Sequence, residues 1–206
     1  MRTQGRLPIT VNCEIRRVTG CLLIFLALQT LLSPGLAVAA AGRKPVISEV
    51  TLRAGQQDVL LSAKLDAPIS EKVREAVMGG VPLTFRYKIR LTKKGAPLGE
   101  RILRTEDVVH TIQYNPVKKI FDFKTEGYRD DLQKTTKDAN EAFRWMSRVE
   151  EWHLYPLKKL RSHVRYRVRV MATLNSVELP SVLGYLFFFT SIFNSDTPWK
   201  QVEFSY

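Results

Sequence analysis

The chain of 206 residues contains very little cysteine: Cys13 and Cys21 are its only thiols, and both lie within the first 40 residues. Residues 41–206 therefore have no cysteine, which excludes both a disulfide framework and thiolate catalysis in this part of the chain. A cysteine-free domain is compatible with an oxidising compartment.

Motifs for catalysis and for cofactor binding are also lacking. The three histidines, His110, His153 and His163, are not paired at helical spacing, and no acidic cluster completes a metal-ligand pattern. His110 shares an expected strand face with Glu106, but a cross-strand ion pair explains that spacing as well as a site does. There is no nucleophile elbow, phosphate-binding glycine loop or dinucleotide fingerprint. We therefore expect a protein that is not an enzyme and that binds no metal or cofactor.

No apolar run reaches the ~20 residues that a membrane-spanning helix needs. The run 21–32 has 12 residues, follows Arg16-Arg17 and precedes the breaker Ser33-Pro34-Gly35 and the small residues 37–39. This order predicts a signal peptide over residues 1–40 and a single domain over residues 41–206. We expect a periplasmic or envelope-associated protein with no integral membrane span after cleavage. An uncleaved anchor is the alternative.

Acidic residues are too few to balance the basic ones. The net charge is +12, of which the first 40 residues contribute +3, leaving +9 for the expected domain. Such a charge favours anionic partners, or it reflects only a basic protein without one. Nucleic acid is not expected as a partner, because export separates the chain from it and no aromatic stacking motif interleaves the arginines.

What the sequence does contain is mostly strand signal. Alternating apolar and polar residues, bounded by glycine, proline and asparagine turns, predict strands at 46–53, 58–65, 83–91, 101–114, 117–125, 164–174 and 199–206. Helical patterns cover 70–78, where Ser70 is the expected N-cap, and 135–152, where Thr135 and Asp138 resemble a capping box. The fold class is therefore mainly β or α+β: an antiparallel sheet or sandwich with two helical insertions.

Two of these strands have basic outer faces. Alternate residues of a strand stand about 7 Å apart on one face, so neighbouring strands would gather six candidate anion-binding side chains: Arg86, Lys88, Arg90, Arg165, Arg167 and Arg169. The alternative is that carboxylates on adjacent strands neutralise them. Those carboxylates are Glu100, Glu106, Asp107, Asp122 and Glu126.

The sequence also resembles a known family. The run 75–85, with Gly-Val-Pro-Leu-Thr-Phe after a short helix, and the earlier run 59–65 are similar to the proteobacterial domain-of-unknown-function family 4390. The resemblance covers about Val46 to Tyr206. It implies an exported protein without established activity, encoded beside a membrane sensor kinase of the nitrogen-regulation type and an RNA methyltransferase. It transfers no functional residues.

Three functional hypotheses follow. The first is a non-enzymatic envelope interaction or accessory module for an unknown envelope protein, linked by the resemblance to a sensor kinase. The second is a binder of anionic envelope components, lipopolysaccharide or anionic lipid, through the basic strand faces. The third is association with the outer membrane through the apolar run 183–193 or the closing strand, where Val202, Phe204 and Tyr206 alternate up to an aromatic C-terminus.

Overall fold

The computed structural model describes residues 44–96, 99–176 and 195–206. The chain divides into two units, Met1–Ala41 and Gly42–Tyr206, and all the described residues belong to the second. We call this second unit the domain. It contains both sheets and all the buried side chains of the described residues, so it has a hydrophobic core of its own.

The domain is built from two antiparallel sheets, as the sequence predicts. The small sheet has the order β1-β2-β7, with the bounds β1 (Val46–Ala54), β2 (Asp58–Asp66) and β7 (Arg148–Pro156). The large sheet has the order β10-β8-β3-β4-β5-β6, and β9 pairs with β8. Its strands are β3 (Leu83–Ala96), β4 (Gly99–Asn115), β5 (Ile120–Glu126), β6 (Gln133–Thr136), β8 (Arg165–Ser176), β9 (Ser195–Asp196) and β10 (Lys200–Ser205).

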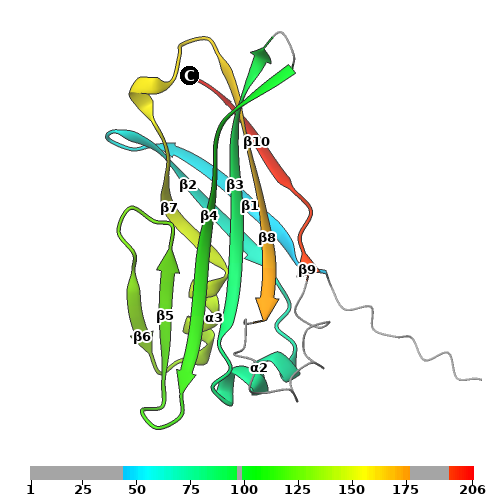
Figure 1. Cartoon of the computed structure of the whole chain (residues 1–206), viewed down its shortest axis with the longest axis vertical. Coiled ribbons are helices and arrows are strands. Elements are labelled where there is room, and N and C mark those ends of the chain that lie inside the picture. The colour runs from blue at the N-terminus through cyan, green and yellow to red at the C-terminus, as the bar shows by residue number, and fades with distance from the viewer. Residues whose placement is uncertain (1–43, 97–98, 177–194) are drawn as a thin grey trace, which may run out of the picture. The chain divides into compact units, whose positions relative to one another are not determined.

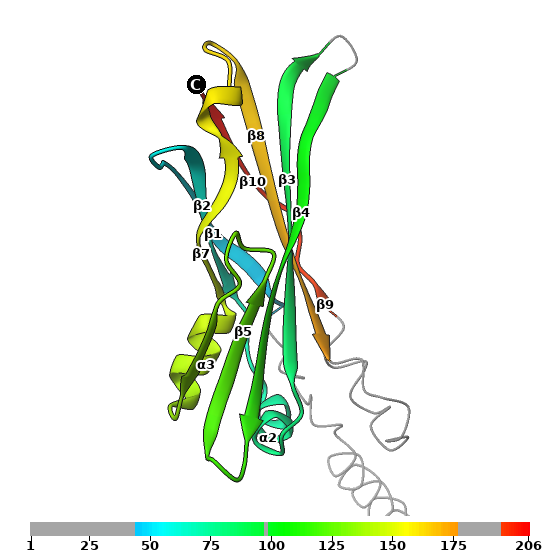
Figure 2. The same cartoon turned by 60° about the vertical axis from the view of Figure 1, so that its left-hand side comes forward.

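The two sheets face each other across the core. Figure 1 shows β1 and β2 crossing β3, β4 and β8 obliquely, and Figure 2 shows the small sheet beside the inner face of the large one. On one side the sheets close, because β1 contacts β8 and β10. On the other side α3 (Ala139–Met146) fills the opening and contacts β4, β5, β6 and β7.

The predicted alternation of β3 and β8 is confirmed. Tyr87 and its apolar neighbours on β3 are buried, as are Tyr166 and Val168 on β8, whereas the arginines point outward. The Tyr87 hydroxyl would be costly to bury without a partner. It donates a hydrogen bond of 2.6 Å to the Met146 carbonyl oxygen at the end of α3, so this contact ties the large sheet to the helix.

The first predicted helix is confirmed as α2 (Glu71–Met78). The Ser70 hydroxyl accepts a hydrogen bond from the Val73 backbone N–H, which satisfies one of the free donors at the helix start. Val73 and Val77 are buried. After Gly79 and Gly80 the chain turns directly into β3.

The predicted helix over 135–152 is wrong at both ends. Residues 133–136 form β6, the N-cap is Asp138, and β7 begins at Arg148. The period of 3.6 continues through Val149 and Trp152, but residues 148–156 pair with β2, which would otherwise be an open edge of the small sheet. Tertiary pairing therefore overrides local helical periodicity here.

The remaining predictions about membranes and export concern other parts of the chain. The expected signal peptide, residues 1–40, and the apolar run 183–193 lie outside the described residues. Within residues 44–96, 99–176 and 195–206, no helix combines the length and apolar character needed to span a bilayer.

Candidate functional site

The six predicted basic residues do lie on one surface. β3 and β8 are hydrogen-bonded neighbours, and Arg90 stands directly opposite Arg169. Arg167 faces Thr92 on one side and Glu203 of β10 on the other. We call this surface, formed by the outward side chains of β10, β8, β3 and β4, the arginine face.

Carboxylates of neighbouring strands neutralise half of these cations. Arg167 pairs with Glu203 at 2.6 Å and also with Glu100, whereas Arg169 pairs with Glu100 at 3.2 Å. Arg86 lies 3.4 Å from Asp107. Glu203 was not among the carboxylates that the sequence suggested. Its hydrogen bonds from Lys94 and from Arg167 lower the pKa of its carboxyl group.

The other three basic residues have different surroundings. The Arg90 guanidinium carbon lies 5.5 Å from the centre of the Trp199 ring, an arrangement typical of a cation–π contact. Among the described residues, neither Lys88 nor Arg165 has a carboxylate within 4.0 Å. Anion binding by this face stays a prediction, since no bound anion or binding measurement bears on it.

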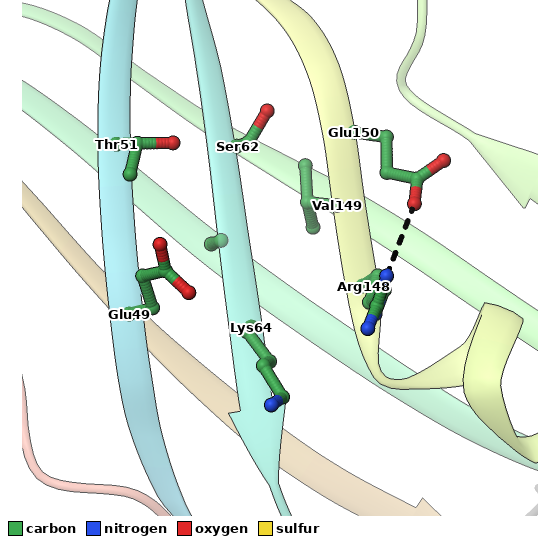
Figure 3. Close-up of a pocket in the computed structure, with 8 residues that line it drawn as sticks. Glu49, Thr51, Ser62, Lys64, Arg148, Val149 and Glu150 are labelled. Carbon is green, nitrogen blue, oxygen red and sulfur yellow. Dashed lines mark ion pairs between the residues drawn. The ribbon is translucent and has the colours of Figure 1, made fainter.

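A groove lies elsewhere, on the outer face of the small sheet (Figure 3). Irregularities on both sides of β2 create it. Ser48 is an extra residue in β1, and in β7 the two residues Glu150 and Glu151 face the single residue Ser62, so β7 has one extra residue there. Glu151 adopts a left-handed conformation with φ 48°, and its N–H donates to the Ser62 hydroxyl at 3.1 Å instead of to the β2 backbone. Such bulges re-aim side chains.

The small-sheet groove encloses about 280 Å³ and is mostly polar. Figure 3 shows side chains of β1, β2 and β7 arranged around it. Arg148 and Glu150 of β7 point toward each other, with 4.0 Å between Nη1 and Oε1. The lining consists of Glu49, Thr51, Ser62, Ala63, Lys64, Arg148, Val149 and Glu150.

An aromatic cleft of about 250 Å³ adjoins this groove, lying between the β5–β6 hairpin, α3 and the start of β7. The ammonium group of Lys134 lies over two aromatic rings, 4.2 Å from the centre of Trp145 and 5.2 Å from that of Phe123. Leu132 is half-exposed at the rim. The full lining is His110, Phe123, Thr125, Tyr128, Asp130, Leu132, Lys134, Trp145, Arg148 and Glu150.

His110 lines the aromatic cleft, and each of its two ring nitrogens has a defined hydrogen-bonding role. A carbonyl oxygen only accepts, so Nδ1–H donates to the Met146 oxygen at 3.4 Å, and Nε2 accepts from the Tyr128 hydroxyl at 3.5 Å. The Tyr128 oxygen accepts from the Glu150 N–H at 3.3 Å. Burial lowers the pKa of His110 to about 4 and raises that of Tyr128 to about 12.

These pKa values determine the charge of both groups at neutral pH. At neutral pH the His110 ring is neutral and the Tyr128 hydroxyl is protonated, so neither has a pKa suited to a general acid or base at pH 7. The groove and the cleft have Arg148 and Glu150 in common. These two side chains therefore lie at the boundary between the polar groove and the aromatic cleft.

The buried carboxylate of Asp58 links β2 to β7 and to the loop between β5 and β6. Asp58 at the start of β2 is 6% exposed and accepts hydrogen bonds from Arg129 at 2.7 Å and from His153 Nδ1 at 3.0 Å. Burial alone would raise the pKa of Asp58, but these two partners lower it overall. An Asp–His pair also occurs in hydrolase triads, yet in the described part of the chain no serine or threonine hydroxyl contacts the His153 ring.

The sequence did not reveal the groove or the cleft. The helix expected over 135–152 concealed β7, and no sequence motif marks the adjacent Glu150 and Glu151. In the structure Glu150 lines both cavities, and Glu151 pairs with Arg53 across the small sheet. A usable signal was present, since Val149, Trp152 and Leu154 also fit a strand that contains one irregularity.

Comparisons with known proteins identify the family. Residues 43–203 match the family described as Domain of unknown function (DUF4390), so the chain belongs to that family. The resemblance seen in the sequence is thereby confirmed. No curated protein and no solved structure matches the chain.

Proposed function

We propose that the domain is a non-enzymatic interaction module of the cell envelope, which binds an extended segment of a partner protein along the groove and the aromatic cleft. The observation that carries this proposal is that the two cavities adjoin at Arg148 and Glu150.

The chemistry of the lining fits a peptide segment. Exposed groups of both charge signs, including Glu49, Lys64, Arg148 and Glu150, can bond the N–H and C=O groups and polar side chains of an extended chain. The rings of Phe123 and Trp145 provide an apolar recess for one side chain of the partner. Aromatic and arginine side chains are the residue types that most often anchor protein interfaces.

Crosslinking in intact cells tests this proposal. A tagged full chain is crosslinked with formaldehyde and purified, and its partners are compared between Arg148→Glu and Arg165→Glu. Both variants reverse one exposed arginine, but only Arg148 lines the cavities. We expect Arg148→Glu to lose a specific partner that Arg165→Glu retains. Equal recovery from both variants would contradict the proposal.

The identity of the recovered protein tests a finer part of the proposal. The link to a membrane sensor kinase comes from the family resemblance alone. A kinase among the partners that depend on Arg148 would support this link. Loss of a different envelope protein would support the interaction module and overturn the link to the kinase.

A further inference from the structure

The aromatic cleft already holds a cation, the ammonium group of Lys134. This group lies 4.2 Å from the centre of the Trp145 ring and 5.2 Å from that of Phe123. The two ring centres are 5.7 Å apart and the ring planes are inclined by 55°, so the rings form two walls of a corner. The faces of aromatic rings carry negative partial charge, which attracts cations and repels anions. The corner therefore suits a positive group.

The place of Lys134 on an edge strand does not by itself explain this contact. β6 is the last strand of the large sheet. Exposed lysines on edge strands discourage pairing with other chains, but that role keeps the ammonium group in water. The side chain of Lys134 is instead half-buried over the rings. In the described part of the chain, no carboxylate within 4.0 Å holds the ammonium group there.

The neutral polar groups of the cleft already have partners within the protein. His110 and Tyr128 bond each other and neighbouring backbone groups. The Thr125 hydroxyl accepts a hydrogen bond of 2.9 Å from the Leu132 backbone N–H and donates one of 3.4 Å to the oxygen of the same residue. A ligand that depends on neutral hydrogen-bonding groups therefore has to compete with bonds that already exist.

Two carboxylates of the lining are less well satisfied. Asp130 and Glu150 are both exposed. Among the residues that the structure describes, no basic group lies within 4.0 Å of the Asp130 carboxylate. Glu150 has Arg148 at 4.0 Å, a separation too long for a hydrogen bond. A guanidinium group that stacks on a ring can still donate in its own plane to such carboxylates. The cleft thus offers both contacts that an arginine side chain uses.

Lys134 can leave the cleft at little cost. A cation–π contact at an exposed site is weak, and fixing a lysine side chain loses rotamer entropy of at least similar size. Exchange for another cation also keeps the charge balance of the lining, which contains two acidic side chains, one lysine and one arginine. A neutral or anionic group in place of the ammonium group would disturb this balance.

We infer that the aromatic cleft binds an arginine side chain of the partner segment, and that Lys134 occupies this place until the arginine displaces it. This inference rests on the proposed interaction module, because the arginine belongs to the partner. It adds the chemical identity of the side chain that the cleft recognises, and a contact within the free domain that competes with it.

A small arginine analogue tests the cleft without the partner. The purified full chain is titrated with N-acetyl-arginine methylamide, and NMR follows the indole N–H signal of Trp145. The other two tryptophans, Trp152 and Trp199, serve as internal references. We expect a saturable shift of the Trp145 signal. The citrulline analogue, which has nearly the same shape but no charge, should bind about tenfold more weakly. The glutamate analogue should leave the signal unchanged.

Two substitutions with a matched control separate the cation site from a general surface effect. Lys134→Met keeps the apolar stem but removes the competing ammonium group, so it should strengthen binding of the arginine analogue about threefold. Glu150→Gln should weaken binding about threefold. Glu151→Gln neutralises the adjacent exposed residue, which does not line the cleft, and should leave binding unchanged.

The inference and the proposed function can fail separately. No shift of the Trp145 signal at about 50 mM analogue, equal binding of the citrulline analogue, or weaker binding to Lys134→Met would overturn the inference. If Arg148→Glu still loses a crosslinked partner in that case, the interaction module stands without the arginine. Binding of the arginine analogue without any such partner would support the arginine site and contradict the module.

Discussion

The arginine face and the part of the domain around the groove and the cleft differ in how regularly their strands pair. On the arginine face, β3 and β8 pair without interruption over 11 registers, and the charges of neighbouring strands meet in ion pairs. Around the groove, β1 and β7 both contain bulges and Glu151 has a positive φ, and in the adjoining cleft His110 lies buried. On the regular face three of the six predicted cations form ion pairs with carboxylates, whereas the irregular region leaves cavities lined by polar groups. We therefore expect function on the irregular side.

The largest expected effect concerns the loop that closes the aromatic cleft. Gly127 has φ +87°, and a Cβ atom there would lie 2.3 Å from the Asp107 carbonyl oxygen. Gly127→Ala should therefore lower the free energy of unfolding by about 4 kcal/mol, because it combines backbone strain with a steric clash. Urea denaturation measures this loss.

Gly95 provides a matched control for backbone strain alone. It has φ +83°, but a Cβ atom there would meet no described atom within 4 Å. Gly95→Ala should cost about 1–2 kcal/mol. Equal losses at positions 95 and 127 would show that the close approach to Asp107 does not matter.

The second prediction concerns acid sensitivity caused by His110. Its pKa is about 4 in the folded protein and ordinarily 6.5, so the unfolded chain binds more protons between these values. This contribution to stability is present above pH 6.5 and is lost as the pH falls to 4, by about 3 kcal/mol in total. His110→Gln should flatten the pH dependence of the free energy of unfolding. Urea denaturation at several pH values measures this dependence.

The third prediction compares one aspartate from each region. Asp58→Asn removes a buried charge that bonds Arg129 and His153, and should cost about 1–3 kcal/mol. Asp107→Asn on the arginine face breaks a solvent-exposed pair with Arg86 and should cost less than about 1 kcal/mol. Thermal unfolding of both variants gives the ranking. The reverse order would remove the energetic distinction between the two regions.

Much of the fold could be predicted because its strands keep a strict period of two. Tyr87 and Val168 point inward and Arg86 and Arg167 outward, as alternation requires. The adjacency of β3 and β8 could only be assumed, since the paired residues are at least 73 positions apart, from Lys93 to Tyr166, and such pairing leaves no local signal. Glu203 neutralises Arg167 only because β10 pairs with β8. The local sequence of neither strand predicts this pairing.

The groove and the cleft could not be predicted for a different reason. Both depend on where β7 begins, and residues 147–152 satisfy a helical period as well as a strand with a bulge. The strand forms because β2 has backbone groups that would otherwise lack partners. They pair with β7 and with the Ser147 carbonyl oxygen. Lys134 reaches Trp145 only because residues 133–136 form a strand beside β5.

Photocrosslinking in living cells identifies the face of the domain that contacts a partner protein. A photoreactive amino acid is placed at Thr51 or Glu150 in the groove, and at Lys88 or Thr173 on the arginine face. We expect discrete protein adducts from positions 51 and 150 and none from positions 88 and 173. Adducts confined to positions 88 and 173 would contradict this expectation and assign the interaction to the arginine face.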